Sequence, residues 1–260
     1  MKKQKIVISF TIVCAFFAAL LLTAFPAYAH FPWVNLTDYN PKKGSTLKFT
    51  LGWGHHYPID GFLKKDEVQT LTIISPNETK QTVEYTSEVE LQSGNTLNID
   101  GAYIVAAIRK AGYYTKTAQG GVREPKTGLK NVIRCSYAHM CMKAIASVGK
   151  EGKADKVIGH PIEIIALENP ARLRAGDYMP IQVLVDGKPY SGNVFATYVG
   201  FSTEPNTFAY ATSADKKGQA RIRILQPGIW LIKVSHEVPY SDISKCDVES
   251  YVATLTFAVE

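Results

Sequence analysis

Four histidines stand where an imidazole could bind a metal ion: His30, His55, His56 and His236. Neutral imidazole is the commonest metal ligand among side chains, and it suits zinc, copper, iron and nickel. The sequence has no Gly-x-Ser-x-Gly or His-Glu-x-x-His pattern and no phosphate-cradling glycine loop. We therefore expect metal binding without catalysis, and we assign no catalytic residue.

His30 becomes chemically distinct if the segment before it is removed. Residues 1–29 combine three lysines, an apolar run from Ile6 to Phe25 and a small-x-small ending at Ala29, which is typical of a cleaved secretory signal. An uncleaved membrane anchor is the alternative. Cleavage would give His30 a free α-amine beside its imidazole, with reference pKa values of about 7.7–8.0 and 6.5. Both groups could then chelate one divalent ion near neutral pH.

An alternating row of apolar residues leads to His55, and its members are Leu47, Phe49, Leu51 and Trp53. Because alternate residues of a strand share a face, His55 continues the core-facing row where the strand ends. His56 falls on the opposite face. Gly52 and Gly54 could host a bulge that reverses this parity and brings His56 inward. Both histidines stay candidates, and His55 is preferred.

The same parity places His236 at the end of a second apolar row, which consists of Trp230, Ile232 and Val234. A single histidine in such a position is more often a hydrogen-bonded structural residue. With a histidine N-terminus as well, a shared site of His30, His55 or His56, and His236 becomes a competing interpretation.

The composition is that of a chain able to bury a core, with 46% hydrophobic and 20% charged residues. The formal net charge is +6, but three of the basic residues lie within positions 1–29, which leaves 26 basic against 23 acidic residues. No run of Lys and Arg exceeds two residues, so nothing favours nucleic acid as a partner. Beyond the signal, no stretch is long and apolar enough to cross a membrane.

From Ser45 to Val259 the chain is a series of short runs rich in β-branched and aromatic residues, separated by turn formers. This pattern predicts an all-β protein made of two immunoglobulin-like antiparallel β-sandwich domains. The linker is expected near residues 149–153. We place the N-terminal domain with the metal candidates at 30–157 and the C-terminal domain at 158–260.

One stretch, Val132 to Val148, has apolar residues at helical spacing and predicts a short helix in the first domain. On that helix Cys135, His139 and Met142 would form a second stripe of soft donors, for which a structural role is the simpler interpretation. A secreted chain favours a disulfide among its three remaining cysteines. A helix would pair Cys141 with Cys246, and a strand in its place would reverse that judgement.

Several segments together resemble a family of bacterial periplasmic proteins associated with cobalt and nickel uptake transporters, long catalogued only as a domain of unknown function. The matching segments are Ala29-His30, Gly54-His55, residues 161–170 (PIEIIALENP) and residues 228–234 (GIWLIKV). The resemblance implies a periplasmic or secreted β-sandwich that binds or hands over nickel or cobalt, with His30 and His55 as ligands.

That resemblance also implies a membrane metal transporter as partner. Copper and zinc stay open as the bound ion. Two other functions also remain: a structural or adhesive extracellular module that binds no metal, and a copper-dependent oxidative enzyme with an N-terminal histidine.

Overall fold

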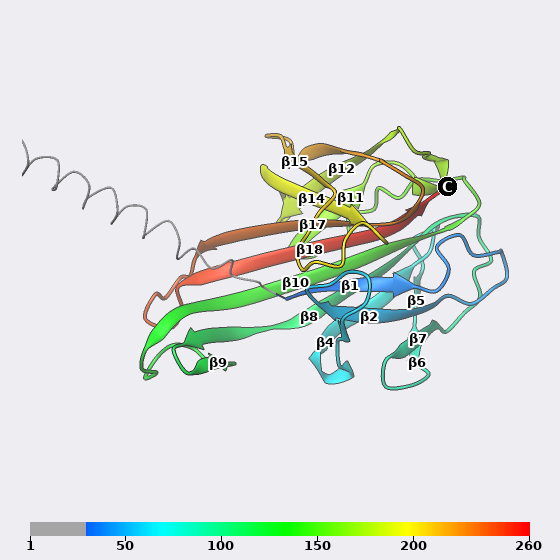
Figure 1. Ribbon diagram of the computed structural model, residues 1–260. Coiled ribbons are helices and arrows are strands. Elements are labelled where there is room, and N and C mark those ends of the chain that lie inside the picture. The colour runs from blue at the N-terminus through cyan, green and yellow to red at the C-terminus, as the bar shows by residue number, and fades with distance from the viewer. Residues whose placement is uncertain (1–29) are drawn as a thin grey trace, which may run out of the picture.

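The computed structural model describes residues 30–260, and the predicted signal segment lies outside this range (Figure 1). The described residues form three β-sheets. The first sheet has the order β1-β2-β7-β6, with β3 paired to β2. Its strands are β1 (Phe31–Leu36), β2 (Lys48–Gly54), β3 (Gly61–Phe62), β6 (Val83–Tyr85) and β7 (Glu90–Ser93).

The central sheet has the order β15-β14-β17-β18-β10-β8-β4-β5, with β9 paired to β8. Four of its strands are long and run side by side through the whole molecule (Figure 1): β8 (Gly101–Thr117), β10 (Val132–Val148), β17 (Gly228–Pro239) and β18 (Val248–Val259). The shorter ones are β4 (Val68–Ile74), β5 (Lys80–Gln81), β9 (Gly120–Val122), β14 (Gly192–Tyr198) and β15 (Tyr210–Ala214).

The third sheet has the order β11-β12-β13, with β16 paired to β12. Its strands are β11 (Ile162–Ala166), β12 (Tyr178–Val185), β13 (Lys188–Pro189) and β16 (Gln219–Arg223). Two short 3-10 helices, η1 (Lys65–Glu67) and η2 (Pro170–Arg172), complete the elements. The prediction of an all-β protein built from packed, mostly antiparallel sheets is confirmed.

The central sheet is packed on both faces. On β10, Met142, Ala144 and Ala146 belong to the core against the first sheet, whereas Cys141 and Ile145 belong to the core against the third sheet. A strand buried on both faces reads as a continuous apolar run rather than an alternation. Residues 132–148 form strand β10, so the predicted helix is wrong. The continuous apolar run also has apolar residues at helical spacing, which explains the error.

The two predicted domains share this sheet. Strands β10 and β18 pair in parallel, Ser136–Ala144 against Val248–Thr256, and join the two halves of the chain. Residues 149–161 connect β10 to β11, so the predicted boundary at 157 falls between strands.

A disulfide joins Cys135 to Cys246, while Cys141 is a buried free thiol. Pairing of Cys141 with Cys246 rested on the helix and is wrong: on a strand, Cys141 faces the core of the third sheet, where burial raises its pKa to about 12. Within residues 30–260, no helix has the length and apolar character needed to span a bilayer.

Strand β1, which sequence reasoning did not predict, fixes the start of the described chain. It pairs with β2 so that Phe31 lies opposite Gly54. Two buried threonines of β18 also hold it: Thr254 donates to the Pro32 carbonyl at 2.8 Å, and Thr256 donates to the Val34 carbonyl at 2.7 Å. Residue 30 is thereby placed beside the end of β2.

Candidate metal centre

His30 and His55 lie side by side. The register of β1 with β2 places the residue before Phe31 next to the residue after Gly54. The centres of the two imidazole rings are 4.0 Å apart, and their planes are tilted by 45°. The structure therefore brings together two of the four predicted ligands.

His30 is also stacked on an aromatic neighbour. Its ring lies 5.4 Å from the indole of Trp53, and the two planes are within 7° of parallel. The guanidinium of Arg109 lies 4.7 Å from the same indole, and Glu67 accepts a hydrogen bond from Arg109 at 2.9 Å. A cation over an aromatic face is attracted to it. This chain of contacts anchors the surface on which His30 rests.

His56 is held away from the pair by Asp60. The Asp60 carboxylate accepts from the main-chain N–H of His55 at 2.7 Å and of His56 at 3.2 Å, and it lies 3.1 Å from the His56 ring. These bonds, with the His55 N–H first, lower the pKa of Asp60. A side chain at Gly54 would collide with this carboxylate, and Gly54 also has a φ of 148° that favours glycine.

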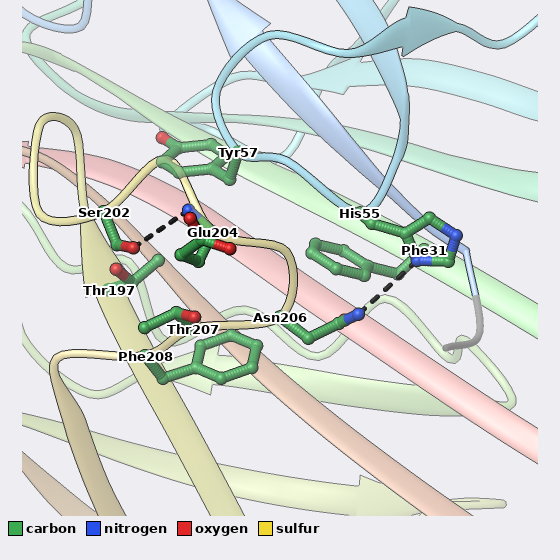
Figure 2. Close-up of a pocket in the computed structure, with 9 residues that line it drawn as sticks. All are labelled: Phe31, His55, Tyr57, Thr197, Ser202, Glu204, Asn206, Thr207 and Phe208. Carbon is green, nitrogen blue, oxygen red and sulfur yellow. Dashed lines mark hydrogen bonds between the residues drawn. The ribbon is translucent and has the colours of Figure 1, made fainter. Parts of the chain in front are cut away.

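The second half of the chain reaches His55 through the loop between β14 and β15. Asn206 donates its main-chain N–H to the His55 carbonyl at 3.1 Å, and its side-chain amide lies 3.4 Å from Nδ1 of the His55 ring (Figure 2). Beside this contact is a small pocket of about 10 Å³, room for one water molecule. Its lining is drawn in Figure 2: Phe31, His55, Tyr57, Thr197, Ser202, Glu204, Asn206, Thr207 and Phe208.

The electrostatics of the site favour the neutral, ligating form of His55. Burial, followed by the neighbouring His30, lowers the pKa of His55, while Asp60 acts in the opposite direction. Lys233 lies nearby, with its ammonium 4.3 Å from the centre of the Phe31 ring, and burial lowers its pKa to about 8. A metal ion requires its imidazole ligands to be deprotonated.

His236 does not join this pair. The row that it ends packs under the third sheet, whereas Leu231 on the opposite face packs with Phe31 and Trp33. The His236 ring instead lies 4.9 Å from Tyr190 and 6.1 Å from Tyr251. It therefore occupies the other face of the central sheet.

The soft-donor stripe predicted on the helix is also not formed. Cys135 is in the disulfide, and Met142 packs against the first sheet. His139 lies 2.8 Å from the carboxylate of Glu249 and stacks on Tyr251 at 4.8 Å. Among residues 30–260, no three His, Cys, Asp or Glu side chains are arranged to hold a metal ion.

Sequence reasoning missed three residues of the site. Trp53 stood in the apolar row and was read only as core, although its position two residues before His55 already placed both on one side of the strand. Arg109 and Asn206 gave no signal, because their contacts join segments far apart in the sequence.

Solved structures similar to this chain include the D00-D0 domain of intimin, at 12% identity over 88% of this chain and 100% of that one, with a TM-score of 0.22. The D0-D1 domain of intimin has 12% identity over 88% and 99%, with a TM-score of 0.18. The mouse nectin-like molecule 4 ectodomain (Ig1-Ig3) has 10% identity over 81% and 93%, with a TM-score of 0.15. Scores this low say nothing about function.

A search of curated proteins found no match. The model of one protein family matches residues 27–238, a range that includes His30, His55 and His236. The chain belongs to that family, which is described as "Domain of unknown function (DUF4198)".

Proposed function

We propose that this protein is a non-enzymatic binding protein for a divalent transition metal, with nickel or cobalt favoured and His30 and His55 as ligands. The observation that supports this most strongly is the 4.0 Å separation of their ring centres. A metal ion lies about 2.0–2.1 Å from a ligating imidazole nitrogen, so one ion can be shared by both rings once they turn and move slightly apart. Nitrogen donors without a thiolate suit nickel and cobalt, whereas copper would bind more tightly wherever it is supplied.

The third donor in this proposal is the α-amine that signal cleavage would create on His30. The amine and the imidazole of one residue close a chelate ring, and His55 adds a nitrogen from a different strand. Strand β1 supports this arrangement, because its pairing with β2 holds Phe31, while Thr254 and Thr256 bond to the carbonyls of Pro32 and Val34. A ligand set held on rigid strands loses little entropy when the ion binds.

The proposed location is the periplasm or the exterior of the cell. The signal-like N-terminal segment and the Cys135–Cys246 disulfide both support an oxidising compartment. There the protein would serve as an accessory component of metal uptake, and a membrane metal transporter is the proposed partner.

The other two functions are less well supported. A copper-dependent oxidative enzyme would use the same pair of imidazoles, but it needs a flat, exposed aromatic face for a polymeric substrate. Trp33 is fully buried, and the hydroxyl of Tyr57 is buried too, so these two aromatic residues do not supply that face. A structural or adhesive module would give no reason for two imidazoles to meet beside the predicted cleavage site.

Calorimetric titration with Ni²⁺ at neutral pH tests the proposal. The protein that starts at His30 should bind one ion, and His30→Ala or His55→Ala should each remove most of the affinity. The matched control is His56→Ala, since His56 is the adjacent imidazole but is paired with Asp60. Equal binding by all three variants would show that the ion is held elsewhere, and no binding by the parent protein would refute the function.

A further inference from the structure

The distance between the two imidazoles constrains the geometry of the ion that they can share. With a metal–nitrogen bond of about 2.1 Å, the ion lies about 3.2 Å from each ring centre. Two such rings are then about 4.5 Å apart for a ligand angle near 90°, about 5.2 Å for a tetrahedral angle and about 6.4 Å for a linear pair. The observed 4.0 Å is shorter than all three separations, so a shared ion requires the rings to move apart, and the right-angled arrangement requires the smallest movement.

Contacts on both sides hold the rings near this separation. His30 is stacked on Trp53, and Trp53 is backed by Arg109, which Glu67 anchors. Arg109 and Glu67 are themselves well buried, with 13% and 15% of their side chains exposed. The first ring therefore rests on a platform that the rest of the molecule fixes.

The second ring is held from the opposite half of the chain. Asp60 fixes the main chain of His55, and Asn206 contacts both its carbonyl and its ring. Spreading the rings to a tetrahedral separation of about 5.2 Å would require His30 to slide off Trp53 or His55 to move against Asn206.

From this geometry we infer that the site selects ions that place neighbouring ligands at right angles, such as nickel(II) and copper(II), over tetrahedral zinc(II), and that Trp53 is the residue that sets this preference. Square-planar and tetragonal nitrogen sites are typical of copper(II) and nickel(II), whereas zinc in protein sites prefers a tetrahedron. This inference rests on the proposed function and adds which metal ions the site prefers.

Competition between Ni²⁺ and Zn²⁺ in the protein that starts at His30 tests the inference. The parent protein should prefer Ni²⁺, and Trp53→Ala should reduce the ratio of nickel to zinc affinity by about tenfold, a typical effect of removing a group that orients a ligand. Trp53→Phe keeps an aromatic platform and should keep the ratio. The matched control is Phe62→Ala, because Phe62 is an exposed aromatic residue on the strand paired with β2.

The visible absorption of bound Co²⁺ gives a readout that needs no variant. Tetrahedral Co²⁺ absorbs strongly, whereas Co²⁺ with ligands at right angles absorbs weakly, and we expect the weak spectrum. A strong tetrahedral spectrum, or an unchanged affinity ratio in Trp53→Ala, would overturn the inference while leaving metal binding intact. Failure to bind either Ni²⁺ or Zn²⁺ would overturn the proposed function and this inference with it.

Discussion

A pair of histidines lies beside each face of the central sheet, and the two pairs differ in what lies between their rings. On the face toward the first sheet, His30 and His55 face each other directly at 4.0 Å. On the face toward the third sheet, His139 and His236 lie on either side of the Tyr251 ring. His139 is also bonded to Glu249. The difference is therefore that the rings of His30 and His55 meet directly, whereas a tyrosine ring lies between those of His139 and His236.

Two oppositely charged groups buried under the third sheet are matched with each other. Lys143 and Glu163 form an ion pair of 2.9 Å, with 4% and 1% of their side chains exposed. Glu163 also accepts the main-chain N–H groups of Ile158 and Gly159. A buried charge requires such partners, so we assign this face to stability and the His30–His55 face to binding.

The largest expected difference between the two faces of the central sheet is the loss of stability when the buried ion pair on the third-sheet face is broken. Glu163→Gln leaves the Lys143 ammonium buried without a counter-charge and should lower the free energy of unfolding by about 3–5 kcal/mol. Nickel affinity of the folded protein should not change. Urea denaturation measures the first quantity and calorimetry the second. Glu260→Gln, which breaks an exposed pair with Lys150, is the control and should leave stability unchanged.

The same pair predicts a pH dependence. Burial alone raises the pKa of Glu163, but Lys143 and the bonds to its carboxylate lower it overall. A lowered carboxyl pKa stabilises the fold at pH values above the unfolded pKa of about 4.3, and this stability is lost as the pH falls through the folded value. Glu163→Gln removes this contribution, while the acid titration of the neighbouring His160, whose pKa burial lowers to about 4, remains in both proteins. An identical acid response in both proteins would contradict the assignment.

A smaller effect is expected from the histidines of the third-sheet face. His236→Ala should leave nickel affinity unchanged, and so should His139→Ala, whose partly exposed contact with Glu249 contributes less than about 1 kcal/mol to stability. Calorimetric titration of both variants checks this. Loss of nickel affinity in either variant would mean that the ion is bound on the third-sheet face, or that a change on that face alters the His30–His55 site.

The alternation of apolar residues along strands correctly predicted which side of their strands His55 and His236 occupy. His55 and His236 both end core-facing rows, as expected, but the row of His55 faces the core under the first sheet and that of His236 the core under the third. Parity assigns a residue to one side of its own strand. It contains no information about which core that side meets, so it could not exclude His236.

The error over residues 132–148 has a related cause. Periodicity reports burial on one face, and β10 is buried on both, so its sequence lost the alternation that identifies most strands. The cysteine pairing failed with it. Loop residues such as Asn206 have no periodicity at all, and only the folded chain shows that they reach the site.

The central claim is that His30 binds metal through its amine as well as its ring, and a one-residue change at the N-terminus tests it most directly. A protein that starts at Ala29 keeps both imidazoles and every contact described here but moves the free amine away from His30. Calorimetric titration with Ni²⁺ at neutral pH should show an affinity at least about tenfold weaker than that of the protein starting at His30, since one donor of the chelate is lost. Equal affinity in the two proteins would contradict the account.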